Sequence, residues 1–272
     1  MRALSLPGCA SRVAFQFGVM ARLGASGERF DVVAGASSGS ICGAVTVAGL
    51  CDRGPHFARE LGSIPIVSTR YLDTERSVFG MGQILRDTLR RNLPEARLQG
   101  TAAELLVATT HAGRYARRLL GRDRSDEARL GRDPLVIHSN RERRDLHEII
   151  LASCYIPVLY AGVARLDGAL HLDGALADNT LLDALVARGA TDITVVTPFS
   201  GGAVAQTMFA AEGPLRPRSG VRLRVLYPAR PLSIGRFDFS LARIEEALGM
   251  PHAERVIGPA AETPIANLRA TA

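Results

Sequence analysis

Apolar and polar positions at the start of the chain alternate between a strand pattern and a helix pattern. The apolar run Ala3–Leu6 ends at Pro7-Gly8, which is typical of a strand that closes into a tight turn. Arg12–Leu23 has apolar residues at helical spacing, and Phe30–Ala34 predicts a second strand before the small, helix-compatible stretch Ser38–Leu50. A strand–helix–strand–helix order this early in a chain predicts a mainly parallel sheet.

Later apolar runs extend the same pattern. Strands are predicted over four short runs: Leu105–Thr109, Pro134–His138, Ile193–Thr197 and Val221–Leu226. Helices are predicted over four others: Gly82–Asn92, Arg143–Ser153, Leu181–Arg188 and Phe239–Leu248. We therefore expect an α/β fold, a three-layer α/β/α sandwich with a mainly parallel central sheet, in a single domain over residues 1–272.

Composition narrows the chemistry more than the fold. All 33 basic residues are arginine, and the absence of lysine excludes a Walker-A loop, a Schiff-base lysine, a Ser–Lys dyad and a protein-kinase site. The six histidines and the four cysteines have no metal-ligand spacing, so we expect no metal and no cofactor. The cysteines, which we expect to be reduced, are Cys9, Cys42, Cys51 and Cys154.

The basic balance does not by itself indicate nucleic acid. The net charge is +6, but aromatic residues make up only 5%, and the arginines are dispersed or interleaved with acids. We expect a solvated surface with some attraction to anionic lipid headgroups, and no nucleic-acid partner. No apolar stretch reaches the ~18 residues of a membrane span, and no apolar leader is apparent. The expected location is cytoplasmic, with peripheral membrane contact as a further option.

The segment Gly35-Ala36-Ser37-Ser38-Gly39 follows the second predicted strand and opens a predicted helix. This is the Gly-x-Ser-x-Gly spacing of a nucleophile elbow, in which a sharp turn holds the serine strained with its hydroxyl exposed. The flanking glycines let strand and helix approach without Cβ clashes. Ser37 is therefore predicted to be a nucleophile, the alternative being an ordinary Gly/Ser-rich turn.

A serine nucleophile needs a base, and the early position of the elbow limits the choice. The α/β-hydrolase fold places its elbow after several strands, whereas only one predicted strand precedes this one. A Ser–Asp–His triad of that fold, with Asp173 and His252 in the required chain order, is therefore disfavoured.

A second signal is the stretch Leu166–Asn179, which holds Asp-Gly-Ala twice, at Asp167 and Asp173. An Asp-Gly pair between apolar runs is typical of a hairpin turn, which is our interpretation for Asp167. Asp173 is followed by Asp178-Asn179, which can cap the next helix or order the loop. His171 alternates with Asp173 on a strand and shares its face, so it either tunes the aspartate or is a hydrogen-bonded hairpin histidine.

Together these motifs resemble the patatin-like phospholipases. The family has a glycine-rich loop before a helix, an early elbow, a helix that leads into the hairpin of a Ser–Asp dyad, and a closing C-terminal element. The segments that are similar to those motifs in this sequence are Gly8-Cys9-Ala10-Ser11-Arg12 with Phe15–Met20, the elbow, Ala152–Pro157 with Asp173-Gly174-Ala175, and Arg236–Phe239.

The resemblance implies a patatin-like fold and a Ser37–Asp173 dyad without a catalytic histidine. It implies an oxyanion hole formed by backbone N–H groups around Gly8, Cys9 and Ala10, and an acyl-enzyme. The implied activity is that of a serine acyl hydrolase, of the lipase, phospholipase A or lysophospholipase type, on a phospholipid or other lipid ester. Arg12 would orient the loop or contact a phosphate, the alternative being a surface arginine with a packed stem.

The sequence departs from the family pattern in the loop. Cys9 and Ala10 stand in place of two glycines, and Val13 in place of the glycine after the basic residue. Their N–H groups still donate unless the loop requires a positive φ at those positions. The alternative is therefore a catalytically weak or inactive member that binds lipid or regulates, and an acyltransferase using Ser37 is a closer variant.

Two stretches lack a steady period, Gly62–Gly100 and the charged Arg114–Arg132, and we expect a lid or insertion at about residues 62–132. Five residues in it fall near one face of a helix: Met81, Ile84, Leu85, Thr88 and Leu89. That helix either forms a mobile wall over Ser37 at a lipid surface or packs on the core as an ordinary surface helix. The small-residue tail from Gly258 is expected to be a surface strap.

Overall fold

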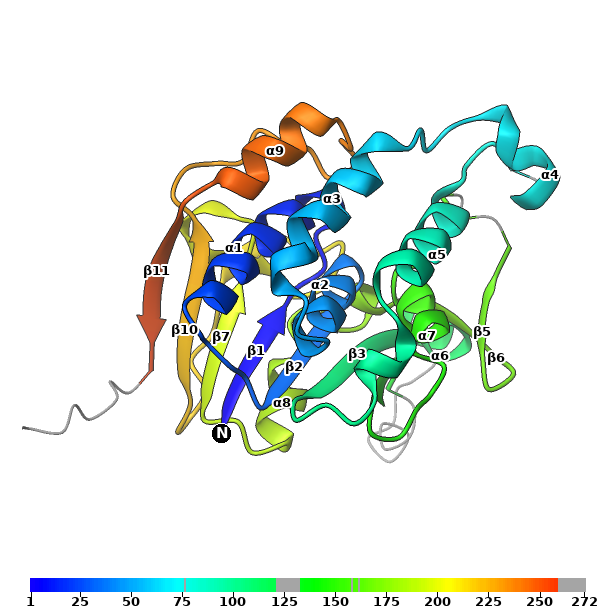
Figure 1. Ribbon diagram of the computed structural model, residues 1–272. Coiled ribbons are helices and arrows are strands. Elements are labelled where there is room, and N and C mark those ends of the chain that lie inside the picture. The colour runs from blue at the N-terminus through cyan, green and yellow to red at the C-terminus, as the bar shows by residue number, and fades with distance from the viewer. Residues whose placement is uncertain (76, 121–132, 158, 161, 259–272) are drawn as a thin grey trace, which may run out of the picture.

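Figure 1 shows the computed structural model of the chain, which describes residues 1–75, 77–120, 133–157, 159–160 and 162–258. Within these residues a nine-stranded sheet forms the centre of the molecule, in the order β11-β10-β7-β1-β2-β3-β6-β5, with β4 also paired to β3. The strands are β1 (Arg2–Leu6), β2 (Val32–Ala36), β3 (Glu104–His111), β4 (Leu135–Ser139), β5 (Ala164–Leu166), β6 (Ala169–Asp173), β7 (Asp192–Val196), β10 (Arg222–Pro228) and β11 (His252–Ile257).

The middle of the sheet is parallel and its edges are antiparallel. The neighbours β10, β7, β1, β2 and β3 all pair in parallel, as the strand–helix alternation predicts. Antiparallel partners are added by β11 at one edge and by β4, β6 and β5 at the other. A small separate pair joins β8 (Ala203–Ala205) to β9 (Glu212–Pro214). The prediction of a mainly parallel central sheet is confirmed.

Helices cover both faces of the sheet unequally. The described helices are α1 (Val13–Ala25), α2 (Ser38–Val47), α3 (Gly54–Ser63), α4 (Leu72–Glu75), α5 (Met81–Asn92), α6 (Ala112–Leu119), α7 (Leu146–Ser153), α8 (Leu182–Ala187) and α9 (Leu241–Gly249). Figure 1 shows α1, α2, α3, α5, α7 and α9 over the near face. The far face is covered by the six-residue α8 and by the chain around β8, so the second outer layer is thin.

Alternation along each strand divides the core between these two faces. In β1, Leu4 and Leu6 belong to the apolar cluster under the near helices, whereas Ala3 belongs to the cluster that contains Leu182 and Leu185 of α8. This follows from the two-residue period of a strand, whose successive side chains point to opposite faces. The residues are apolar on both faces because both faces are buried.

The apolar stripe of α5 packs on the core, which favours the alternative that α5 is an ordinary surface helix. Leu85 is 4% and Leu89 0% exposed, and both belong to the cluster under the near helices. Burial of such side chains is worth about 1.5–3 kcal/mol each, so the core holds the helix in place. The range 62–132 also contains the sheet strand β3 and so is not one insertion. Residues 121–132, and the tail beyond Gly258, lie outside the described residues.

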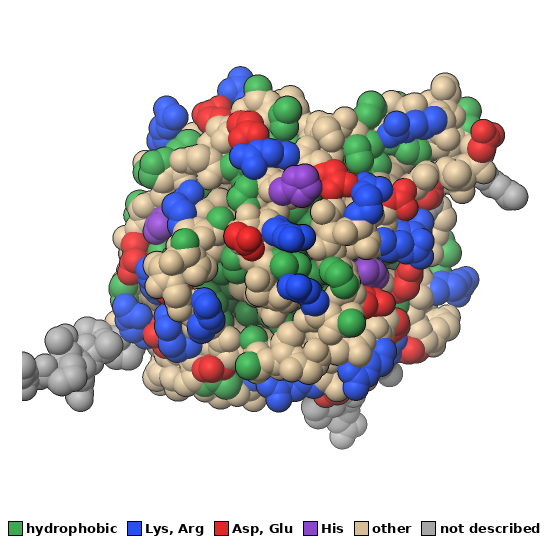
Figure 2. All heavy atoms as spheres, viewed as in Figure 1, with side chains coloured by type: hydrophobic (Ala, Val, Ile, Leu, Met, Phe, Trp, Pro, Cys, Tyr) green, Lys and Arg blue, Asp and Glu red, His purple; other side chains and the backbone are tan. Residues whose placement is uncertain are grey.

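Arginines on the helical face are scattered among acids. Figure 2 shows blue and red side chains interleaved over α3, α5 and α9, with no single basic patch on the face in view. Arg59 of α3 pairs with Glu245 of α9, and Arg91 of α5 pairs with Glu60 of α3. Part of the positive charge is therefore tied up in pairs between neighbouring helices.

Candidate active site

Ser37 lies at the sharp turn between β2 and α2, in a backbone conformation that L residues rarely adopt. Its φ is 52° and its ψ is −133°, and the side chain is 8% exposed. A Cβ on Gly35 would lie 2.6 Å from the carbonyl oxygen of Gly39, and one on Gly39 would lie 1.9 Å from that of Leu6. Only glycine fits at these two positions, which is the packing that a nucleophile elbow requires.

Two side-chain hydroxyls, those of Ser153 and Ser40, hold the turn in its strained form. The Ser37 N–H donates to Ser153 Oγ at 2.9 Å, and Ser40 Oγ donates to the Ser37 carbonyl oxygen at 2.6 Å. Ser153 ends α7 and is fully buried. Sequence reasoning assigned it no role, although it falls in the segment that resembles the family's helix end. Surrounding hydrogen bonds of this kind are what allow a costly conformation to persist.

The register of the sheet brings Asp173 to Ser37. Ala36 at the end of β2 pairs with Ala108 of β3, and Asp173 at the end of β6 pairs with the next residue, Thr109. The other edge of β3 at these positions is taken by β4, so β2 and β6 lie end to end along one edge. The carboxyl ends of the two strands therefore meet, and the residues at those ends face each other.

Ser37 and Asp173 are hydrogen-bonded in this arrangement. Ser37 Oγ donates to Asp173 Oδ2 at 2.6 Å, and the Ala175 N–H donates to the other carboxylate oxygen at 2.9 Å. Two hydrogen bonds of 2.8 Å fix the Asp173 backbone. The Asp173 N–H donates to the Tyr155 carbonyl oxygen, and Thr110 Oγ1 donates to the Asp173 carbonyl oxygen. The carboxylate is thus held at one orientation.

Burial dominates the electrostatics of this pair. Asp173 is 0% exposed, and burial raises the pKa of its carboxyl from 3.8 to about 7, although the hydrogen bonds from Ser37 and Ala175 lower it. A carboxylate with a pKa near 7 is a far better proton acceptor than an ordinary aspartate. The pair therefore has the composition of a nucleophile with its general base.

The loop of residues 8–10 lies against Ser37, and its N–H groups differ in what they bind. The Gly8 N–H donates to Asn179 Oδ1 at 2.7 Å and the Cys9 N–H to Ser38 Oγ at 3.0 Å. For the Ala10 N–H, no hydrogen-bond acceptor is found in the described part of the chain. Ala10 has a φ of +53°, whereas Cys9 has a φ of −152°. Of the two residues that stand in place of glycines, only Ala10 therefore has the backbone conformation that favours glycine.

Gly8 is the loop residue for which glycine is required by space. A Cβ there would lie 2.6 Å from the Ser37 Cβ and 3.1 Å from Asn179 Oδ1. Asn179 also donates through Nδ2 to the Ala205 carbonyl oxygen at 3.0 Å, which ties the loop to the chain beyond α8. From the sequence we expected Asp178-Asn179 to cap a helix or order a loop, and Asn179 does the second.

The remaining predicted residues lie near the site or far from it. Arg12 donates through Nε to the Ile234 carbonyl oxygen at 3.0 Å, and its guanidinium carbon lies 5.2 Å from the centre of the Phe199 ring. His171 Nδ1 shares a 2.8 Å hydrogen bond with Thr109 Oγ1, and burial lowers its pKa. His252 is on β11, which β10, β7 and β1 separate from β2. The described residues give Ser37 no histidine partner.

The cysteines do not compete as nucleophiles. Burial raises the pKa of Cys9 to about 12, against smaller lowering by Ser38, Arg12 and Arg236. A thiol with so high a pKa stays protonated at neutral pH and reacts slowly. Over the residues that the structure describes, no group of His, Cys, Asp or Glu is arranged to hold a metal ion.

Ser37 opens into a small cavity that adjoins a larger groove. The cavity has a volume of about 60 Å³ and is lined by the loop of residues 8–10 together with Ser37, Ile156, Ala175, Asn179, Phe199, Ala205, Met208, Arg236 and Phe237. The groove has a volume of about 520 Å³, and Phe237 lines it as well. Its other lining residues are mostly apolar and include Ile64, Ile66, Val67, Phe79, Met81 and Phe239.

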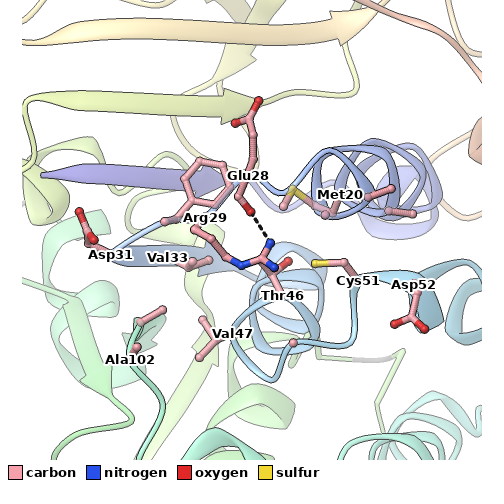
Figure 3. A pocket seen from close by; sticks show the side chains of 16 residues that line it. Met20, Glu28, Arg29, Asp31, Val33, Thr46, Val47, Cys51, Asp52 and Ala102 are labelled. Atoms are coloured by element: carbon pink, nitrogen blue, oxygen red, sulfur yellow. Dashed lines mark hydrogen bonds between the residues drawn. The ribbon is translucent and has the colours of Figure 1, made fainter.

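Another cavity, of about 600 Å³, lies where β2 begins, at the opposite end of that strand from Ser37 (Figure 3). Arg29 extends across it and donates to the Glu28 carbonyl oxygen at 2.9 Å. Two of its three acids have partners, because Glu28 pairs with Arg2 and Arg224, and Asp31 accepts from the Arg2 N–H. Burial raises the pKa of its thiol, Cys51. No activated nucleophile is found among the described residues that line this cavity, so it is not the candidate active site.

The fold and the site together define an α/β protein with a buried serine–aspartate pair at the carboxyl end of a central strand. The sequence model of the Patatin family, described as patatin-like phospholipase, matches residues 4–186, and the chain belongs to this family. Membership supports lipid ester hydrolysis as the general class of activity.

Individual relatives resemble the chain less clearly than the family model does. No curated protein matches the chain. Among solved structures, the crystal structure of VipD from Legionella pneumophila is similar, with 14% sequence identity and a TM-score of 0.39. The alignment covers 74% of this chain and 50% of the VipD chain. In the described part of the chain, no helix is long and apolar enough to span a membrane.

Proposed function

We propose that this protein is a serine acyl hydrolase that cleaves lipid esters through Ser37 and Asp173 by way of an acyl-enzyme. The observation that carries the proposal is the 2.6 Å hydrogen bond from a strained serine at an elbow to a fully buried aspartate. Strain and burial both cost stability, and proteins keep such features mainly at functional sites.

In the first half-reaction Ser37 Oγ bonds to the ester carbonyl carbon while its proton passes to Asp173 Oδ2. The bond between that carbon and the alcohol oxygen then breaks, and the alcohol leaves with the proton from Asp173. In the second half-reaction a water molecule gives a proton to Asp173 and its oxygen bonds to the acyl carbon. The free acid leaves as Ser37 Oγ takes the proton back.

The negative charge that develops on the carbonyl oxygen needs donors in the loop of residues 8–10. The Ala10 N–H is the most available of these donors because it has no other acceptor among the described residues. Gly8 and Cys9 donate to neutral side-chain oxygens, which an oxyanion replaces with stronger, charge-assisted hydrogen bonds. Each such donor is typically worth about 3 kcal/mol, and the start of α2 adds its positive end.

The apolar groove next to Ser37 is the proposed place for the acyl chain. Its volume of about 520 Å³ is in the range of ligand pockets, and Phe237 lines both this groove and the cavity at Ser37. Two large apolar side chains that line the groove are exposed, Val67 at 60% and Phe237 at 59%, and Phe209, which follows the cavity residue Met208 in the chain, is 80% exposed. Exposed aromatic and aliphatic groups with arginines among them suit a lipid surface, so we propose that this side makes peripheral membrane contact.

The decisive experiment is labelling with a fluorophosphonate probe together with hydrolysis of a short-chain ester. Wild type should react with both, whereas Ser37→Ala and Asp173→Asn should react with neither. His252→Ala is the matched control and should retain labelling and turnover, since His252 lies far from Ser37. Equal turnover in wild type and Ser37→Ala would refute the proposal.

One alternative has an observation in its favour. The positive φ of Ala10, +53°, is unfavourable for an L residue, and the Gly8 N–H already donates to Asn179. The N–H groups of this loop are therefore less available to an oxyanion than those of a run of glycines. These features favour a weak or inactive member that binds lipid. Vesicle binding without probe labelling at any pH would support it, and an added acceptor alcohol would reveal acyl transfer.

A further inference from the structure

One short segment of the C-terminal part is fastened to the loop beside Ser37. The Ser11 N–H and Ser11 Oγ donate to the Arg236 carbonyl oxygen at 3.0 and 2.8 Å, and Ser11 Oγ also lies 2.7 Å from that of Gly235. Arg12 adds the hydrogen bond to Ile234. The backbone of segment 234–237 is therefore fixed relative to the loop, although Ser11 and Gly235 are 224 positions apart in the sequence.

Segment 234–237 lies outside the residues that match the family, which end at 186, yet it forms one wall of the cavity at Ser37. Two consecutive side chains of this wall line the cavity, the charged Arg236 and the aromatic Phe237. No acidic side chain is found among the described residues that line it. The charge of this wall therefore comes from Arg236.

The guanidinium of Arg236 is only loosely held. Its Nη1 lies 3.4 Å from the Met208 carbonyl oxygen, and its Nη2 lies 3.7 Å from Glu212 Oε1. Both contacts are long, and the side chain of Arg236 is 42% exposed. Arginine has five N–H donors that fit a phosphate or carboxylate, so most of this capacity remains for a bound anion.

The two sides of the wall differ in polarity. Phe237 continues into the apolar groove, which contains no charged lining residue among those described, whereas Arg236 and the nearby Arg12 supply positive charge on the loop side. Arg236 lines the same cavity as Ser37, so it is available to the alcohol part of an ester whose acyl chain occupies the groove. An anionic group on that alcohol part meets a cation there.

We propose that Arg236 makes this site prefer esters whose alcohol part carries a negative charge, such as the phosphate of a lysophospholipid. The proposal rests on the proposed function, because it assigns the two ends of the substrate on either side of Ser37. Arg236 acts here as a specificity-determining residue and takes no part in the transfer of protons.

The test compares two esters with the same acyl chain, anionic lysophosphatidylglycerol and neutral monoacylglycerol. The measured quantity is the ratio of kcat/KM for the anionic ester to that for the neutral one. Arg236→Gln should lower this ratio about fivefold, the size of a part-exposed ion pair. Arg236→Lys should keep part of the preference, and Glu212→Gln should raise it by removing a competing carboxylate.

Arg243→Gln is the matched control, because Arg243 is similarly exposed in α9 but does not line the cavity. It should leave the ratio unchanged. An unchanged ratio in Arg236→Gln, or an equal fall in Arg243→Gln, would overturn the inference. In either case the proposed function would stand as long as the probe still labels Ser37.

A binding measurement separates the two proposals completely. Ser37→Ala protein is titrated with non-hydrolysable ether analogues of the same two lipids and with glycerol phosphate alone. Arg236→Gln in this background should lower the affinity for the anionic analogue relative to the neutral one, again about fivefold. Equal affinities would overturn the inference whether or not wild type hydrolyses esters. Binding of glycerol phosphate alone would identify the anion, rather than the lipid, as the ligand.

Discussion

Replacing Asp173 by asparagine should abolish hydrolysis and at the same time stabilise the protein above neutral pH. The carboxyl of Asp173 is fully buried, and its pKa is raised from 3.8 to about 7 by that burial. Between about pH 3.8 and about pH 7, the folded protein therefore keeps a proton on Asp173 that the unfolded chain has already released. As the pH rises through this interval, the free energy of unfolding of wild type falls, and it levels off once the folded carboxyl has ionised.

The size of the effect follows from the shift. A change from 3.8 to about 7 is worth about 4 kcal/mol, at about 1.4 kcal/mol for each pKa unit. The asparagine side chain has no proton to release, so the variant lacks this fall. Between about pH 4.5 and about pH 8, the stability of Asp173→Asn relative to wild type should therefore rise by about 3 kcal/mol.

Urea unfolding of both proteins at the two pH values measures this difference. Groups elsewhere titrate equally in both proteins and cancel. Asp183→Asn is the matched control for the loss of a carboxyl group that is not buried, since Asp183 is exposed on α8. In wild type, turnover of a soluble ester should rise as the pH passes through about 7, because the base must be ionised. Parallel stability curves for wild type and Asp173→Asn would refute the assigned pKa and with it this account of the base.

Two further predictions concern the loop and the lipid surface. Ala10 has a positive φ, which costs an L residue about 1 kcal/mol. Ala10→Gly should therefore raise both the free energy of unfolding and the turnover of a short-chain ester, whereas the β-branched Ala10→Val should lower both. A less stable Ala10→Gly would show that the loop is not strained. Phe209 is 80% exposed next to the cavity residue Met208, so Phe209→Asp should reduce hydrolysis of ester in vesicles while sparing a soluble ester. Leu241→Asp is the control, because Leu241 is also an exposed apolar residue but lines neither the cavity nor the groove. An equal effect of the two variants on vesicles would contradict a docking side at Phe209.

The central strands could be predicted from the sequence because both of their faces are buried. Runs such as Ala3–Leu6 and Leu105–Thr109 are apolar at every position or nearly so, and turn residues mark their ends. The edge strand β11 was not predicted, because it is only half-buried and its sequence, His252–Ile257, mixes charged with apolar residues. The same holds for α6, whose apolar side has no buried residue.

Local motifs located the two candidate catalytic residues, but their partners depend on distant contacts. Ser37 and Asp173 could be singled out because the elbow and the Asp-Gly-Ala turn are short patterns with a conformational requirement. Asn179 was expected to cap a helix or order a loop, but its partner Gly8 and the bond of Ser153 to the Ser37 N–H join residues far apart in the sequence, so the local pattern does not show them. Arg236 reaches the cavity at Ser37 only through the fold, held there by hydrogen bonds from the loop.

The strand geometry explains why an aspartate can serve Ser37 as a base. Because β2 and β6 meet end to end along β3, Asp173 approaches Ser37 from within the sheet, where it pairs with Thr109 and is fully buried. A base on an exposed loop would keep water around its carboxylate and a pKa near 4. The same position that shortens the Ser37–Asp173 distance to 2.6 Å therefore also excludes water and raises the pKa of the carboxyl. Proximity and basicity have one structural cause, so a substitution that opens this junction to water should weaken both together.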